Sequence, residues 1–261
     1  MAPPRIAREG RVVIATIDDP ATRNALARDF YEGFRELVEM AGADAGVGAI
    51  VLTGAAGFFS SGGNLHGLKA RSEAPLSERR ASVERLHAMI RAMRASPKPI
   101  IAAIEGGAAG AGASLALACD LIVAARDAYL SIAYVRIGLT PDGGATFFLS
   151  EALPRQLVSE MVFTGDRIPV ERLHALGVVN RLVEPGAALD AAKALAARLA
   201  EGPMRALGRA KGLIARARGA TLADQLAREA EAIAEALGGA EAREGIAAFH
   251  EKRRPDFGKV R

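Results

Sequence analysis

The sequence predicts an α/β fold whose parallel strands alternate with helices. Short apolar runs at 11–17, 49–53 and 100–104 are typical of buried strands. The segments between them carry apolar residues at helical spacing, and such alternation favours parallel pairing through crossover connections. From 187 to 250 the chain consists almost wholly of alanine, glutamate, arginine, leucine and glycine with helical periodicity. This change in composition predicts a C-terminal set of helices.

Neighbouring residues explain where each predicted strand or helix begins and ends. The strand at 11–17 ends where two aspartates and a proline break it, and residues 24–40 predict a helix because their apolar side chains share one face. The later elements are expected as a strand at 49–53, a glycine- and serine-rich loop at 54–64, a helix at 74–95, a strand at 100–104, a helix from about Gly110 and a strand at 121–125. Gly-Pro and glycine breaks at 202–203, 219 and 238–239 divide the C-terminal helices.

The amino-acid composition limits the classes of function that the protein can have. Half of the 261 residues are hydrophobic, which is enough for a sizeable core. The net charge of +4 is spread along the chain, without a dense basic run interleaved with aromatic residues, and tryptophan is absent. This pattern argues against a nucleic-acid partner. A mild positive excess suits a phosphate-bearing substrate, although scattered solvated arginines explain it equally well.

The single cysteine and the N-terminal residues point to a reducing compartment. Cys119 excludes an internal disulfide, and its apolar surroundings favour a buried structural thiol over a nucleophile. The first residues contain no apolar signal core, so we expect a cytoplasmic protein without a membrane partner. The histidines, cysteine and carboxylates show no metal-ligand spacing, so we expect no metal site.

A glycine-rich segment between Glu105 and Asp120 is the most informative part of the chain. It follows a strand and opens a helix of small residues, whose first N–H groups and positive dipole end suit an oxygen that gains negative charge. A dinucleotide fingerprint is excluded because Leu115 stands where a third glycine is needed. The segment is also too short to cross a bilayer. From this segment alone, a tightly packed core helix without chemistry stays an equal alternative.

Four ordered motifs together resemble the crotonase superfamily, which includes enoyl-CoA hydratases and isomerases. The motifs are Val51–Gly54, Phe59–Leu65, Lys98-Pro99 with the glycine helix that ends at Cys119-Asp120, and Gly138–Gly144. The resemblance runs from about residue 10 to the C-terminus. It implies a crotonase-like spiral of ββα units over 1–185, a C-terminal helical region over 186–261, and a homotrimer or dimer of trimers. It also implies an acyl-CoA thioester as substrate.

The resemblance assigns the thioester oxygen to two backbone N–H groups, those of Gly63 and Ala111. A loop glycine and a helix N-terminus would then form an oxyanion hole, and the loss of one such donor typically costs about 3 kcal/mol of transition-state stabilisation. It further assigns substrate contacts to Ala25, within Arg23–Leu26, and to Lys252, which would meet the nucleotide phosphate. For Lys252, a solvated basic helix end is an equally good explanation.

The chain departs from the hydratase pattern where that pattern has two glutamates. Ser114 and Tyr134 occupy these positions, and neither side chain is a good general base at neutral pH. A carboxylate follows at Asp142, where isomerases of the family and a ring-processing branch carry a catalytic aspartate. We expect Asp142 to move a proton between two carbons of an enoyl thioester. The alternative is that Asp142 caps a helix that begins near residue 143.

Ser114 also raises the possibility of an acyl-CoA hydrolase, with His66 or His87 as activating base. A small polar residue that fills the space of a glutamate is the simpler explanation. We place His66, Ser114 and Tyr134 among the residues that line the substrate site. The preferred function is therefore enoyl-CoA isomerisation without a cofactor, since coenzyme A is part of the substrate. The alternatives are hydration, hydrolysis and a non-catalytic acyl-CoA-binding subunit.

Overall fold

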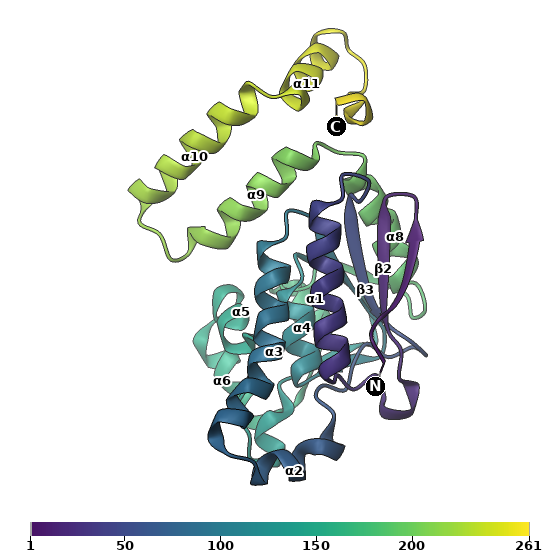
Figure 1. Ribbon diagram of the computed structural model, residues 1–261, viewed down its shortest axis with the longest axis vertical. Helices are drawn as coiled ribbons and strands as arrows, with labels where there is room; N and C mark the ends of the chain where they lie inside the picture. The colour runs from purple at the N-terminus through teal and green to yellow at the C-terminus, as the bar shows by residue number, and fades with distance from the viewer. Residues whose placement is uncertain (1, 261) are drawn as a thin grey trace.

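The computed structural model describes residues 2–260, apart from the side chain of His66. A six-stranded sheet forms its centre, with helices on both faces and a helical extension at one end (Figure 1). The strand order is β1-β2-β3-β4-β6-β9, and every pair after β1/β2 is parallel. These strands are β1 Arg5–Glu9, β2 Val12–Ile17, β3 Ala49–Gly54, β4 Ile100–Ile104, β6 Leu121–Ala125 and β9 Arg181–Val183.

A second sheet of three short strands, in the order β5-β7-β8, lies beside the first. Its strands are β5 Gly107–Ala109, β7 Tyr129–Ser131 and β8 Arg167–Pro169. The main helices are α1 Arg28–Ala43, α2 Leu68–Glu73, α3 Leu76–Ala95, α4 Ala111–Ala118, α5 Ala145–Ala152, α6 Arg155–Thr164, α7 Val170–Ala175, α8 Ala188–Ala200, α9 Met204–Ala217, α10 Leu222–Leu237 and α11 Ala240–His250. Short 3-10 turns complete the fold, with η1 at Pro20–Thr22, η2 at Leu65–Gly67, η3 at Ala133–Ile137 and η4 at Phe257–Val260.

The two faces of the large sheet bury different residues, because successive side chains of a strand point to opposite sides. One face of β2 carries Val13, Ala15 and Ile17, which pack in the larger core with α1, α3 and α4. Val12 and Ile14 point to the other face, where they contact the small side chains of α8. A strand that is buried on both faces has a continuous apolar sequence, and this is why these strands could be predicted from the sequence.

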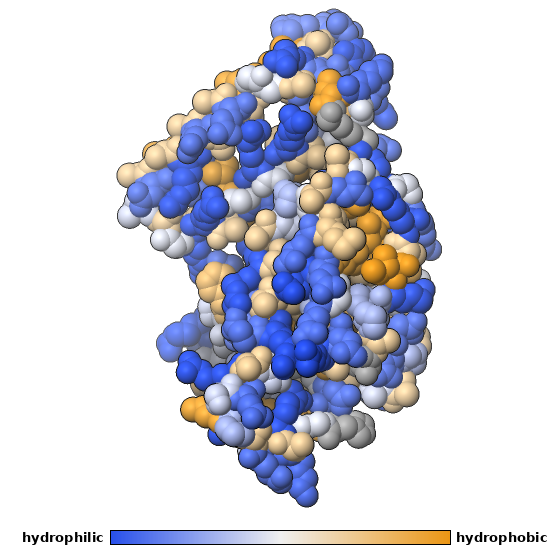
Figure 2. All heavy atoms as spheres, viewed as in Figure 1, coloured by the Kyte–Doolittle hydropathy of each residue, from blue (hydrophilic) through white to orange (hydrophobic). Residues whose placement is uncertain are grey.

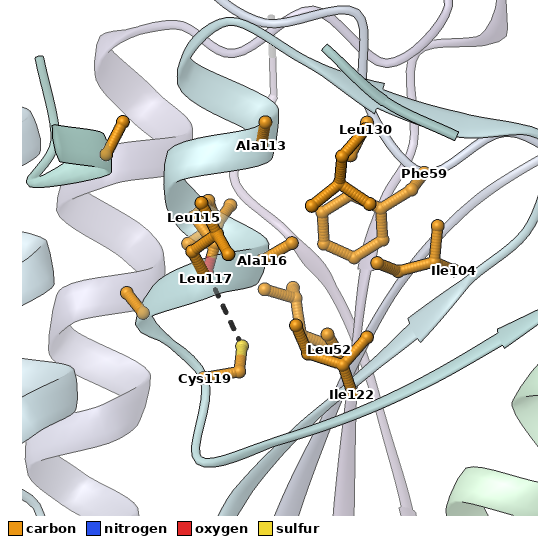
Figure 3. Close-up of a cluster of buried hydrophobic side chains, with 14 of the residues drawn as sticks. Leu52, Phe59, Ile104, Ala113, Leu115, Ala116, Leu117, Cys119, Ile122 and Leu130 are labelled. Carbon is orange, nitrogen blue, oxygen red and sulfur yellow. Dashed lines mark hydrogen bonds between the residues drawn. The ribbon is translucent and has the colours of Figure 1, made fainter. Parts of the chain in front are cut away.

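Helix α4 lies inside the larger core (Figure 3). All eight of its residues are buried, so only small and apolar side chains fit around it. Leu115 and Ala116 contact a cluster that includes Phe59 and Leu130. Cys119, at the end of the helix, is 7% exposed and donates its thiol to the Leu115 carbonyl oxygen. Burial raises the pKa of this thiol, so it is a structural residue, as the sequence predicted.

The structure corrects several predicted boundaries. Helix α1 begins at Arg28 rather than at 24, because Arg23 and Asn24 adopt left-handed backbone conformations that cannot start a helix. Strand β1 and helix α2 were not predicted, since both are short and mostly exposed. Within residues 2–260, no helix is long and apolar enough to cross a membrane.

The C-terminal helices divide into two environments. Helix α8 covers one face of the sheet, whereas α9, α10 and α11 extend beyond the core (Figure 1). Neither α9 nor α10 contains a buried residue. In Figure 2, hydrophobic and hydrophilic residues are mixed along this extension. Ile214, Leu222 and Ile233 are each more than half exposed there. The division of the chain at residue 186 stays a prediction.

One buried ion pair fastens α9 to the core. The Nζ atom of Lys211 lies 2.7 Å from Asp120 Oδ2 and donates to the carbonyl oxygens of Met93 (2.9 Å) and Lys98 (3.0 Å). Asp120 Oδ2 also accepts the Ile100 N–H at 2.8 Å. The Lys211 side chain is only 10% exposed. Removal of one partner from such a pair leaves buried polar groups unsatisfied, which is strongly destabilising.

We therefore expect Lys211→Met to lower the free energy of unfolding by about 3 kcal/mol, measured by urea denaturation at fixed protein concentration. Lys193→Met is the matched control, because the Lys193 ion pair with Glu9 is at the surface and exposed pairs contribute little. Equal midpoints for the two variants would contradict the role of Lys211.

Candidate active site

The loop that contains Gly63 runs directly against the start of α4. A Cβ atom placed on Gly62 would lie 2.6 Å from the Ala109 carbonyl oxygen and 3.2 Å from the Ala111 nitrogen. Gly62 also has a φ of +99°, so only glycine suits this position. Around Gly63, by contrast, no atom lies within 4 Å of such a Cβ. The backbone is thus in contact at Gly62 and open at Gly63.

Two N–H groups at this junction are free to bind a ligand oxygen. Ala111 is the first residue of α4, and its N-cap residue, Gly110, provides no side-chain cap. Neither the Ala111 N–H nor the Gly63 N–H has a hydrogen-bond acceptor among the described residues. Free N–H groups at a helix start favour an anionic oxygen.

Two buried polar side chains shape this loop. Asn24 is fully buried and donates from Nδ2 to the carbonyl oxygens of Ala55 (2.8 Å) and Phe58 (2.6 Å). Ser60, also fully buried, donates to the Asn24 carbonyl oxygen at 2.8 Å and accepts the Gly62 N–H at 3.2 Å. These bonds fix the loop that presents the Gly63 N–H.

A second group of contacts joins three polar residues near the start of α4. The Tyr134 hydroxyl donates to Asp142 Oδ1 at 2.6 Å and lies 3.0 Å from Ser114 Oγ. Ser114 Oγ in turn lies 2.9 Å from the Asp142 carbonyl oxygen and 3.3 Å from that of Gly110. The structure thus brings Ser114, Tyr134 and Asp142 together, next to the residue that precedes Ala111.

Asp142 is not a helix cap, which corrects the structural alternative. Helix α5 begins at Ala145, and its N-cap is Gly144, with no side-chain capping bond. The Asp142 carbonyl oxygen accepts the Ala145 N–H, while its carboxylate points to Tyr134. Gly143 and Gly144 have left-handed φ values and turn the chain before the helix starts. The Asp142 carboxylate is therefore not directed at the first N–H groups of α5.

The environment keeps the tyrosine hydroxyls protonated. Burial and the negative charge of Asp142 raise the pKa of the Tyr134 hydroxyl. The pKa of Tyr31, on α1, is raised mainly by burial and next by the negative charge of Asp142. Neither phenol can act as a base at neutral pH. Asp142 is half-buried.

The arrangement gives Ser114 no histidine partner among the described side chains. His87, on α3, accepts the Gly143 N–H at its Nε2 atom, 3.3 Å away. Ser114 is fully buried, and its hydroxyl faces two carbonyl oxygens and Tyr134. A nucleophilic serine needs a base within hydrogen-bond reach, so these contacts do not favour the hydrolase hypothesis.

The remaining predicted residues have different outcomes. Ala25 is buried, and its N–H donates to Thr22 Oγ1 at 3.1 Å, so that donor is occupied. The side chain of His66 lies outside the described residues. Lys252 follows α11, at the end of the molecule opposite to α2 (Figure 1). The described residues contain no group of three histidine, cysteine or carboxylate side chains that is placed to hold a metal ion.

Sequence reasoning included Asn24 and Ser60 in motifs without a role for either side chain, and it did not single out Tyr31. Asn24 lies in a left-handed conformation, which asparagine tolerates better than most residues, and this preference was a usable signal. Ser60 lies two residues before Gly62. Tyr31 gave no signal, because its position on the predicted helix does not indicate which neighbour it faces.

Comparisons with known proteins identify the family of the chain. A model of the enoyl-CoA hydratase/isomerase family matches residues 7–260. The chain is 33% identical over 250 residues to the 1,2-epoxyphenylacetyl-CoA isomerase of Escherichia coli K12, which covers 95% of each chain. It is 32% identical over 253 residues to the 2,3-dehydroadipyl-CoA hydratase of the same bacterium, which covers 97% of each.

A solved structure agrees over the same length. The crystal structure of an enoyl-CoA hydratase from Polaromonas sp. JS666 superposes with a TM-score of 0.95 at 41% identity, over 98% of this chain and 99% of that one. The relatives thus include an isomerase and hydratases. The names of the two E. coli relatives identify their substrates as CoA thioesters. The chain belongs to the enoyl-CoA hydratase/isomerase family, within the crotonase superfamily, whose enzymes act on CoA thioesters.

Proposed function

We propose that this protein isomerises the double bond of an enoyl-CoA thioester, with Asp142 as the acid and base. The observation that carries this proposal is the cluster beside α4, in which Asp142 is the one carboxylate bonded to Ser114 or Tyr134 among the described residues. The similarity to an isomerase from E. coli supports it. The reaction needs no cofactor, since coenzyme A belongs to the substrate.

In the proposed reaction, the Asp142 carboxylate removes a proton from the carbon between the thioester carbonyl and the double bond of a 3-enoyl thioester. The electrons move onto the thioester oxygen, where the N–H groups of Gly63 and Ala111 stabilise the dienolate. Asp142 then returns the proton to the far end of the former double bond. The product is the conjugated 2-enoyl thioester, and no atom is gained or lost.

Hydration is the alternative function, and the similarity to 2,3-dehydroadipyl-CoA hydratase favours it. Water addition needs one group that activates water and one that protonates carbon. Ser114 and Tyr134 stand where hydratases of the family carry glutamates, and a buried phenol with a raised pKa cannot replace a carboxylate. One carboxylate suffices for a proton shuttle, so the composition of the cluster supports isomerisation.

We also propose that the protein is a homotrimer or a dimer of trimers. The exposed apolar side chains of α9 and α10 support association, since they have no cover within one chain. In such an assembly Lys252 would serve the site of another subunit.

The Asp142→Asn substitution keeps the size of the side chain but removes its basicity. We expect it to lower kcat for conversion of a 3-enoyl-CoA by about 10²–10⁴-fold, read as the ultraviolet absorbance of the conjugated product. Asp127→Asn is the control, because Asp127 is an exposed turn residue.

A 2-enoyl-CoA in the same assay decides among the alternatives. Loss of its absorbance with formation of 3-hydroxyacyl-CoA would identify a hydratase. Tight binding of acyl-CoA without turnover, unchanged in Asp142→Asn, would identify a binding subunit. Release of free coenzyme A would identify a hydrolase.

Ala111→Pro removes one proposed oxyanion donor at a position where proline is compatible with a helix start. We expect kcat to fall by about 10²–10³-fold while the far-ultraviolet circular dichroism stays unchanged. Leu76→Pro, at the first residue of α3, introduces the same ring at another helix start and should keep full activity. Full activity of Ala111→Pro would exclude its N–H from the reaction.

A further inference from the structure

Tyr134 reaches the site from η3 and joins Asp142 to α4. Its side chain is 8% exposed, and its hydroxyl touches Asp142 Oδ1 (2.6 Å) on one side and Ser114 Oγ (3.0 Å) on the other. Ser114 belongs to α4, inside the core. The loop that carries Asp142 is therefore tied through two hydroxyls to the helix that provides the Ala111 N–H.

We propose that Tyr134 and Ser114 form a hydroxyl relay, which positions the Asp142 carboxyl group and keeps it hydrogen-bonded in both of its protonation states. The inference rests on the proposed role of Asp142 as acid and base. Tyr134 and Ser114 are positioning residues in this account, because they act on the substrate only through Asp142.

The proton count supports the relay when Asp142 is ionised. A carboxylate only accepts hydrogen bonds, so the single Tyr134 proton goes to Oδ1. The Ser114 proton then goes to the Asp142 carbonyl oxygen at 2.9 Å. Oδ2 has no hydrogen-bond partner among the described residues, which leaves it as the oxygen that exchanges a proton with the substrate.

The same contacts serve the protonated carboxyl group. A proton taken up at Oδ2 leaves the bond from Tyr134 to Oδ1 in place. A proton carried on Oδ1 reverses that bond: Oδ1 donates to the Tyr134 hydroxyl, which turns its own proton to Ser114 Oγ. Ser114 still donates to the Asp142 carbonyl oxygen. In the first case no hydroxyl hydrogen moves, and in the second only that of Tyr134 rotates, so the two hydroxyls accommodate the carboxyl proton on either oxygen.

The backbone next to Asp142 is in contact with two helices. A Cβ atom on Gly143 would lie 2.8 Å from Ser114 Cβ, so the loop is in close contact with α4. On the other side, the Gly143 N–H donates to His87 Nε2 at 3.3 Å. With Ser114 on α4 and His87 on α3, two helices fix the position of the loop.

The test compares Tyr134→Phe with Tyr129→Phe, a second tyrosine of the three in the chain. Tyr129 has no hydroxyl hydrogen bond among the described residues, and its ring contacts Phe58 and Arg167. We expect Tyr134→Phe to lower kcat about 10- to 100-fold with KM unchanged, the range for a lost hydrogen bond to a charged group. Tyr129→Phe should keep the kcat of the unmodified protein.

A double variant separates positioning from general damage. In the Asp142→Asn background, Tyr134→Phe should cause no further loss of kcat, because the residue that it positions is already inactive. The same fold loss in both backgrounds would overturn the relay, as would a kcat for Tyr134→Phe equal to that of Tyr129→Phe. If Asp142→Asn is fully active, or if the unmodified protein does not turn over, the proposed function fails instead.

Crystal structures of the unmodified protein and Tyr134→Phe then decide the relay independently of activity. We expect the Asp142 carboxylate to leave its position when the hydroxyl is removed. A carboxylate in the same orientation in both structures would overturn the proposal.

Discussion

The site depends on the close approach of two backbone segments, the loop after β3 and the start of α4. Glycine makes this approach possible on both sides. A Cβ on Gly62 would overlap the Ala109 carbonyl oxygen at 2.6 Å, and one on Gly112 would lie 2.7 Å from Ser60 Cβ. Larger residues would separate the segments, and with them the Gly63 and Ala111 N–H groups that we propose as donors to the thioester oxygen. The proposed oxyanion hole would thus be a consequence of backbone packing.

The large sheet provides the rigidity that this approach requires. Strand β3 is buried on both faces, with Ile50 and Leu52 toward α4 and Ala49 and Val51 toward α8. The loop that follows β3 therefore starts from a fixed point, and Asn24 and Ser60 hold the rest of it. Helix α4 is equally fixed because all of its residues are buried. A preorganised site needs no rearrangement when charge develops on the substrate.

The backbone elements around this site could be predicted from the sequence, because they depend on residues that are close together in the chain. Glycine patterns and apolar runs revealed the strands and the helix start, since both depend on neighbouring residues. The place of Asp142 beside Ser114 and Tyr134 followed only from the family resemblance, because the three residues come from α4, η3 and the loop before α5. The contacts themselves were not predictable. That Asp142 faces Tyr134, and does not cap α5, depends on the left-handed turn at Gly143 and Gly144.

Sequence pattern also failed where tertiary contacts override it. The apolar spacing from residue 24 suggested one long helix, but Asn24 is fully buried and its side chain donates to two carbonyl oxygens of the loop that contains Gly63. A short strand such as β1 carries exposed residues throughout and gives no alternating pattern. These exceptions lie next to the site or at the edge of the sheet. Apolar periodicity predicts structure less well there, because the residues serve the site or face solvent.

The most direct test of the account is a crystal structure of the Asp142→Asn protein with a 3-enoyl-CoA bound. The account predicts that the thioester oxygen lies within hydrogen-bonding distance of both the Gly63 and Ala111 nitrogens, with residue 142 facing the carbon between the carbonyl group and the double bond. A thioester oxygen bound elsewhere, or a side chain at 142 out of reach of that carbon, would contradict it.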